Sequence, residues 1–97
     1  MKPVAFKCED SLWQMLASGE KTWDARRYDL SDERIDKLSR SWYRTGRRVK
    51  EVSFENKTSG DVLSFEFKEL VLGFSWAPDW CFIILGKEIS RQLKACT

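Results

Sequence analysis

The segment from Val52 to Phe67 reads VSFENKTSGDVLSFEF. Apolar and polar residues alternate on both sides of NKTSGD, residues 56–61, a segment rich in turn-forming residues. This pattern is typical of two β-strands joined by a hairpin connection. We therefore predict strands over residues 49–55 and 61–72. The core residues expected from these strands are Val52, Phe54, Leu63, Phe65 and Phe67.

Upstream of this hairpin, the chain predicts a strand, a helix and a second strand. Residues 3–8 alternate in the manner of a short strand, and residues 10–18 have the apolar spacing of a helix that ends at Gly19. In the strand predicted over residues 22–28, we expect the face with Trp23 and Ala25 to point to the core. The opposite face then carries Thr22, Asp24, Arg26 and Tyr28.

The remaining segments predict one more helix and one buried strand. Ser31 can cap a helix over residues 32–40. The run CFIIL, residues 81–85, is apolar throughout, which is typical of a central strand buried on both faces. From Lys87 onward we expect one or two last helical turns.

Five strands and two short helices in 97 residues predict one domain, residues 1–97, of the α+β class and mainly β. So many strands in so short a chain favour a curled, mostly antiparallel five-stranded sheet. Such a sheet closes, or nearly closes, into a β-barrel.

Composition excludes several kinds of chemistry. The chain has no histidine, which rules out Ser-His-Asp and Cys-His catalysis. Its three cysteines are far apart, so they predict neither a disulfide framework nor a zinc site but a reducing compartment, with the cytoplasm as the default. There is no apolar run long enough to cross a bilayer and no signal-peptide pattern. We expect no metal, no cofactor and no membrane partner, and a monomer or weak dimer.

Positive charge is concentrated in one segment. The net charge is +2, but residues 37–50, KLSRSWYRTGRRVK, hold six Lys or Arg and no acid, against 11 basic and 15 acidic residues elsewhere. Cations beside aromatic rings predict contacts with RNA or another single-stranded nucleic acid. The alternative is a solvated loop whose Trp42 packs into the core. The predicted contact residues are Arg40, Trp42, Tyr43, Arg44, Arg47, Arg48 and Lys50.

The segment SGEKTWDAR, residues 18–26, resembles the signature of ASCH domains, which belong to the PUA-like superfamily. That signature follows the first helix and reads Gly, any residue, Lys, Thr or a similar residue, any residue, Glu, any residue, Arg. Position 24 is Asp where the family often has Glu, and Gly46-Arg47 stands where Gly-Asp is common. The strands VSFEN and VLSFEF and the closing APDWCFIILG extend the likeness over nearly the whole chain. The residues that match the signature are Gly19, Lys21, Thr22, Asp24 and Arg26.

The resemblance implies a PUA-like barrel with a polar cleft beside the first helix. Some ASCH proteins are similar to acetylcytidine amidohydrolases and others to nucleases, so an enzyme of either type would use Lys21, Asp24 and a glutamate, which is either Glu66 or Glu69 here. Asp24 stands where the amidohydrolases have a threonine, which argues against that reaction. From charge alone, Asp24, Arg26 and Glu66 predict a cross-strand charge ladder instead. The ligand-binding residues that the resemblance implies are Lys21, Thr22, Asp24, Arg26, Tyr28 and Trp76.

A further aromatic group lies in the loop GFSWAPDW, residues 73–80. Phe74, Trp76 and Trp80 either line a base pocket or plug one end of the barrel. The sequence leaves three functions open. The one we favour is an RNA- or nucleotide-binding module. The others are a small enzyme acting on RNA or a modified nucleoside, and a protein-interaction module resembling small phage or prophage domains that act on host machinery.

Overall fold

A computed structural model of the chain describes residues 3–44, 49–73 and 75–94. The elements along the chain are β1 (Val4–Cys8), α1 (Asp10–Ser18), β2 (Trp23–Arg27), α2 (Glu33–Tyr43), β3 (Glu51–Asn56), β4 (Val62–Leu72) and β5 (Trp80–Gln92). The strands form one sheet in the order β1-β3-β4-β5-β2, with β1 and β3 parallel and the other pairs antiparallel. The fold is therefore α+β and mainly β, as predicted, whereas the expected turn at Gly46 lies outside the described residues.

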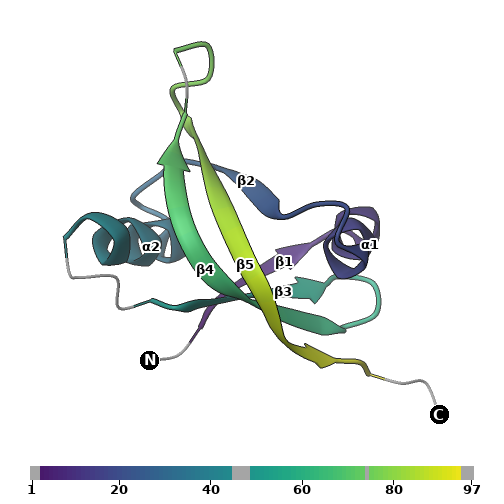
Figure 1. Ribbon diagram of the computed structural model, residues 1–97. Coiled ribbons are helices and arrows are strands. Elements are labelled where there is room, and N and C mark those ends of the chain that lie inside the picture. The colour runs from purple at the N-terminus through teal and green to yellow at the C-terminus, as the bar shows by residue number, and fades with distance from the viewer. Residues whose placement is uncertain (1–2, 45–48, 74, 95–97) are drawn as a thin grey trace.

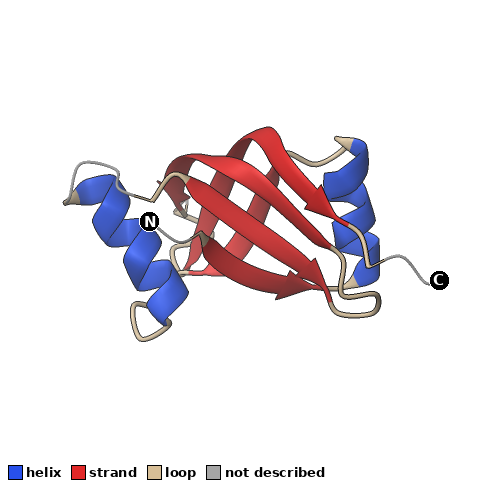
Figure 2. Cartoon of the chain, turned by 90° about the horizontal axis from the view of Figure 1, so that it is seen from below, coloured by secondary structure: helices blue, strands red, loops and turns tan. Residues whose placement is uncertain are grey.

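The sheet curls into a half-barrel, so its two edge strands, β1 and β2, approach each other across an open seam (Figure 1). The two helices lie on opposite sides of the curled sheet (Figure 2). α1 packs on β3, where the Trp13 indole N–H donates to the Phe54 carbonyl at 3.1 Å, and α2 packs on β1 and β4. The two helices thus cover opposite ends of the curled sheet, and the seam between β1 and β2 lies between them.

The core fills the inside of the curl, and most of its strand residues follow the predicted alternation. Val52, Phe54 and Leu63 are fully buried, Phe65 is buried, and Phe67 is half-buried. These residues confirm the predicted inner faces of β3 and β4.

The prediction for β2 placed the wrong face in the core. Asp24 is 2 % exposed and Arg26 is half-buried, whereas Trp23 is 40 % exposed. The register gives the reason, because Asp24 lies opposite Ile83 and Arg26 opposite Cys81, and both β5 residues are fully buried. Directly opposed residues in a sheet share a face. An ion pair therefore occupies the inner face and the tryptophan lies outside, which hydrophobicity alone does not predict.

β5 differs from its prediction in two respects. It is central, between β4 and β2, but only one of its faces is buried: Ile83 is inside, while Phe82 and Ile84 are half-buried. The expected helical turns after Lys87 are instead strand, because residues 88–92 pair with β4. Tertiary pairing thus overrides the local pattern at the end of the described chain.

α2 is longer than predicted and has a different cap. It runs to Tyr43, and its N-cap is Asp32, whose carboxylate accepts from the Arg34 backbone N–H at 3.0 Å. Ser31, the expected cap, donates its hydroxyl to Asp29 at 2.6 Å. The Arg34 guanidinium also binds Asp32, at 2.7 Å, and these hydrogen bonds lower the pKa of Asp32 from 3.8 to about 2.

We predict that Asp32→Ala lowers the free energy of unfolding by about 1 kcal/mol, the usual effect of losing an N-cap. The Asp32 pKa is lower in the folded protein than in the unfolded chain, so its contribution is present above about pH 4 and is lost as the pH falls toward 2. Urea denaturation at pH 7 and pH 3 measures both effects. Ser31→Ala is the control, and a loss equal to that of Asp32→Ala would contradict the assignment of the cap.

Candidate functional site

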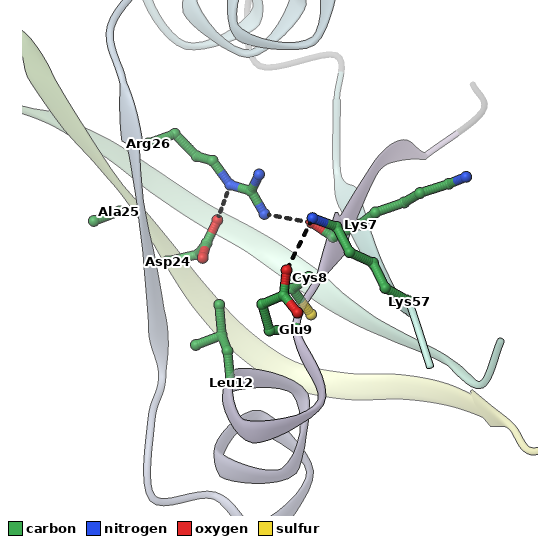
Figure 3. A pocket seen from close by; sticks show the side chains of 8 residues that line it. All are labelled: Lys7, Cys8, Glu9, Leu12, Asp24, Ala25, Arg26 and Lys57. Atoms are coloured by element: carbon green, nitrogen blue, oxygen red, sulfur yellow. Dashed lines mark hydrogen bonds and ion pairs between the residues drawn. The ribbon is translucent and has the colours of Figure 1, made fainter. Parts of the chain in front are cut away.

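A pocket of about 210 Å³ lies at the seam between β1 and β2, beside α1 (Figure 3). Its walls come from the end of β1, the first turn of α1, the middle of β2 and the turn after β3. The lining residues are Lys7, Cys8, Glu9, Leu12, Asp24, Ala25, Arg26 and Lys57. The pocket therefore combines charged groups with the apolar side chains of α1 and β2.

A carboxylate–guanidinium pair forms one wall of the pocket. Asp24 Oδ2 accepts a hydrogen bond from Arg26 Nε at 2.6 Å. Arg26 Nη2 extends across the seam and donates to the Lys7 carbonyl oxygen at 3.1 Å. One side chain thus satisfies the buried carboxylate and links the two edge strands of the half-barrel, because a buried charge requires a partner.

The same wall extends to α2 through an aromatic ring. The guanidinium groups of Arg26 and Arg34 lie 4.6 and 4.7 Å from the centroid of the buried Phe6 ring. Such cation–π contacts hold a guanidinium plane in a fixed orientation while its edge stays available for hydrogen bonds. Phe6 therefore positions Arg26 from the core side of the seam.

The mouth of the pocket carries exposed ion pairs. Lys57 Nζ lies 3.1 Å from Glu9 Oε1, and Lys7 Nζ lies 3.8 Å from Glu55 Oε2. Figure 3 shows the Lys57 amine directed toward the space between Arg26 and Glu9, whereas the Lys7 amine points away from it. The pocket-facing cations are therefore Arg26 and Lys57.

The two buried thiols, Cys8 in the pocket and Cys81 on β5, are poor nucleophiles. Burial, with a further contribution from the nearby Asp24 carboxylate, raises the Cys8 pKa from 9.0 to about 11. Burial likewise raises the Cys81 pKa to about 11. Both thiols are protonated at neutral pH, so Cys8 contributes an apolar surface to the pocket rather than a reactive group.

Of the residues that the resemblance assigned to the ligand, only Asp24 and Arg26 line this pocket. The Lys21 amine lies 4.2 Å over the Trp23 ring, on the opposite face of β2 from Asp24. The other three lie elsewhere. Thr22 is exposed, the Tyr28 hydroxyl is 2.9 Å from Ser39 Oγ, and Trp76 is 78 % exposed in the β4–β5 loop.

The charge ladder and the three proposed catalytic residues do not assemble. Glu66 is exposed on β4, opposite Glu51, and β5 separates β4 from β2 in the sheet. Asp24 pairs with Arg26, while Lys21 points to the other face of β2. Lys21, Asp24 and Glu66 therefore do not converge on one reacting group.

The basic segment divides into packed and exposed side chains. Trp42 contacts Phe67 with ring centroids 6.0 Å apart and packs against the core, as in the alternative interpretation. Tyr43 is exposed, and its hydroxyl is 3.5 Å from the Leu70 carbonyl. Arg47, Arg48 and Phe74 lie outside the described residues. Among the described residues, the exposed cations of the segment are Lys37, Arg40, Arg44 and Lys50.

Among the pocket residues that sequence reasoning missed are Glu9, Leu12 and Lys57, which lie outside the strands. Their approach depends on the parallel pairing of β1 with β3, which brings the turn after β3 beside the end of β1. There the Lys57 backbone N–H donates to the Cys8 carbonyl at 3.0 Å. Parallel pairing joins segments far apart in the chain and leaves no local pattern from which to predict it.

No protein-family model, curated protein or solved structure matches the chain. The likeness to ASCH domains therefore rests on the sequence pattern alone, and two of its motif residues, Asp24 and Arg26, face the pocket. Within the described ranges, no cluster of three or more His, Cys, Asp or Glu side chains could hold a metal ion. In the same ranges, neither helix is long and apolar enough to cross a membrane.

We predict strong coupling between Asp24 and Arg26 in a double-mutant cycle of Asp24→Asn and Arg26→Gln. Each single change leaves a partner group in the seam without its counter-charge. The coupling energy should therefore be about 1 to 3 kcal/mol, measured by urea denaturation of the four proteins.

The control for this cycle is Glu9→Gln with Lys57→Met at the pocket mouth. That pair is exposed, so its coupling should stay below about 1 kcal/mol. Equal coupling in both cycles would show that Arg26 does not hold the seam.

A second prediction concerns the two thiols. Their folded-state pKa of about 11 exceeds the 9.0 of the unfolded chain, so between pH 9 and 11 unfolding releases protons and stability falls as the pH rises. Urea denaturation from pH 8 to 10 measures the slope. The double variant Cys8→Ala, Cys81→Ala should have a shallower slope, and an unchanged slope would contradict the prediction.

Proposed function

We propose that the seam pocket binds a nucleobase and that the protein is an RNA- or nucleotide-binding module of the ASCH, PUA-like type. The observation that supports this most strongly is the Asp24–Arg26 pair, a nearly buried acceptor beside a guanidinium in the pocket wall. A polar pair of this kind in a partly apolar pocket is the usual arrangement for fixing a planar polar ligand.

The pocket volume limits the ligand. About 210 Å³ is below the roughly 300–1,000 Å³ of pockets that enclose drug-sized molecules. A single base fits this limit, whereas a dinucleotide cofactor does not. The ribose and phosphate of a bound nucleotide would then lie at the mouth, in solvent.

The hydrogen-bonding groups match one edge of a base. The Arg26 guanidinium has five N–H donors, of which one is used by Asp24 and one by the Lys7 carbonyl. The second Asp24 oxygen, Oδ1, accepts no hydrogen bond from the residues that the structure describes. Acceptor and donors side by side suit a base edge that presents an N–H next to a carbonyl oxygen, as guanine and uracil do.

The mouth of the pocket suits a phosphate. The Lys57 amine forms an exposed ion pair with Glu9, and such pairs contribute about 0–1 kcal/mol. The amine can therefore exchange Glu9 for a phosphate at little cost. The exposed Arg40, Arg44 and Lys50 of the basic segment would add a sequence-independent attraction for RNA. On the cysteine count, we place this function in the cytoplasm.

The test is a titration with each of the four nucleoside 5′-monophosphates at low salt, in which binding is measured from the amide chemical shifts in NMR spectra. We predict that at least one binds and that Asp24→Asn weakens it about tenfold or more, because the carboxylate acceptor is lost. Lys57→Ala should weaken binding less and reduce its salt dependence, because it removes a phosphate contact.

Lys87→Ala is the matched control, since Lys87 is an exposed lysine on β5 away from the pocket. It should bind as the wild type does. The proposal is wrong if none of the four nucleotides shifts the pocket amides at millimolar concentration, or if Asp24→Asn, shown to be folded, binds as tightly as the wild type.

A further inference from the structure

A second surface of the fold carries exposed aromatic side chains, on the outer face of β2 and the first half of β5. The register places Trp23 opposite Ile84, Ala25 opposite Phe82 and Arg27 opposite Trp80. These six residues, called here the aromatic face, lie on the opposite side of the sheet from Asp24 and Arg26. The main contacts of the two helices are with β1, β3 and β4, and not with β2 or β5.

The two tryptophan rings of the aromatic face are accessible. Trp23 and Trp80 are 40 % and 41 % exposed, and Phe82 is half-buried between them. Trp23 and Phe82 meet edge to face with centroids 5.8 Å apart, so neighbouring strands hold the rings in fixed positions. An outer sheet face normally carries polar side chains, and a grouped set of exposed rings indicates a binding surface.

Charge on the aromatic face favours an anionic partner. The Lys21 amine lies 4.2 Å over the Trp23 ring, and the Arg27 guanidinium lies 5.9 Å from the Trp80 ring. None of the six residues is acidic, and Glu69, opposite Ile84 on β4, stands at the border of the face. A partner with flat rings and regularly spaced negative charges matches this combination, as single-stranded nucleic acid does.

We propose that single-stranded RNA or DNA binds across the aromatic face, with bases stacked on Trp23, Phe82 and Trp80. Its phosphates would lie beside Lys21 and Arg27. A duplex does not fit this arrangement, because its bases are already stacked inside the helix. The inference rests on the proposed function, because the base in the seam pocket would belong to the nucleic acid that binds the aromatic face.

The position of β2 connects the two surfaces. β2 is an edge strand, and Ala25 belongs both to the aromatic face and to the lining of the seam pocket. A single-stranded nucleic acid that crosses β2 can therefore stack bases on the outer face. It can also turn one base over the edge of the sheet toward Asp24 and Arg26. The combined site predicts that an oligonucleotide binds more tightly than a mononucleotide.

The experiment compares Trp23→Leu and Trp80→Leu with the wild type, using a fluorescein-labelled single-stranded RNA of about 12 nucleotides. Leucine keeps an apolar side chain but removes the flat ring. Fluorescence anisotropy at low salt should show about tenfold weaker binding for each variant, about 1.4 kcal/mol, which is within the range for losing one base stack. Tryptophan fluorescence should be quenched by RNA in the wild type and less in the variants.

Two controls accompany these variants. Trp76→Leu removes an exposed tryptophan outside the aromatic face, in the β4–β5 loop, and should bind RNA as the wild type does. The same RNA annealed to its complement should bind at least about tenfold more weakly than the single strand, because its bases cannot stack on the rings. Circular dichroism and urea denaturation check that each variant is folded.

Nucleoside monophosphate titration separates this inference from the proposed function. If the face variants bind mononucleotides normally but RNA weakly, the inference holds. If mononucleotides bind and the folded face variants bind RNA as the wild type does, this inference is wrong but the proposed function stands. The aromatic face would then be a candidate surface for a protein partner. Equal loss of RNA binding in Trp76→Leu also overturns it. If neither mononucleotide nor RNA binds, both proposals fail.

Discussion

The structure depends on the contact of Asp24 with Arg26 at the seam of the half-barrel. β1 and β2 are the two ends of the sheet order, and the Arg26 side chain joins them by donating to the Lys7 carbonyl. Asp24 is nearly buried and takes its counter-charge from the same guanidinium. A buried carboxylate is stable only with such a partner, so the position of Arg26, the closure of the seam and the shape of the pocket are determined together.

The inward orientation of this pair fixes what the other face of β2 presents to solvent. Side chains alternate along a strand, so Asp24 and Arg26 inside require Trp23, Ala25 and Arg27 outside. The protein thus has polar groups in the pocket and exposed rings on the outer surface, the reverse of an ordinary half-buried strand. The two proposed sites would give a nucleotide different contacts, namely hydrogen bonds at the seam and stacking on the aromatic face. β2, as an edge strand, borders both.

The sequence allowed the fold class and much of the core to be predicted, because β3 and β4 alternate regularly and α1 ends at Gly19. At the site, the motif SGEKTWDAR drew attention to Asp24 and Arg26, which do line a pocket beside α1. The resemblance to ASCH domains groups Lys21 and a distant glutamate, such as Glu66, with them. In the structure Lys21 stacks on Trp23, and Glu66 is exposed on β4, because the path of the sheet places these residues on other surfaces.

Local alternation, turn residues and composition predict the five strands, the two helices and the absence of histidine chemistry, because each of these depends on nearby residues or on residue counts. Three features come from tertiary pairing: the inward face of β2, the contact of Lys57 with Glu9 at the pocket mouth, and the strand after Lys87. Each of these depends on pairing between segments far apart in the chain. A paired charge can then occupy a position that hydrophobicity assigns to tryptophan, because its partner is supplied by the fold.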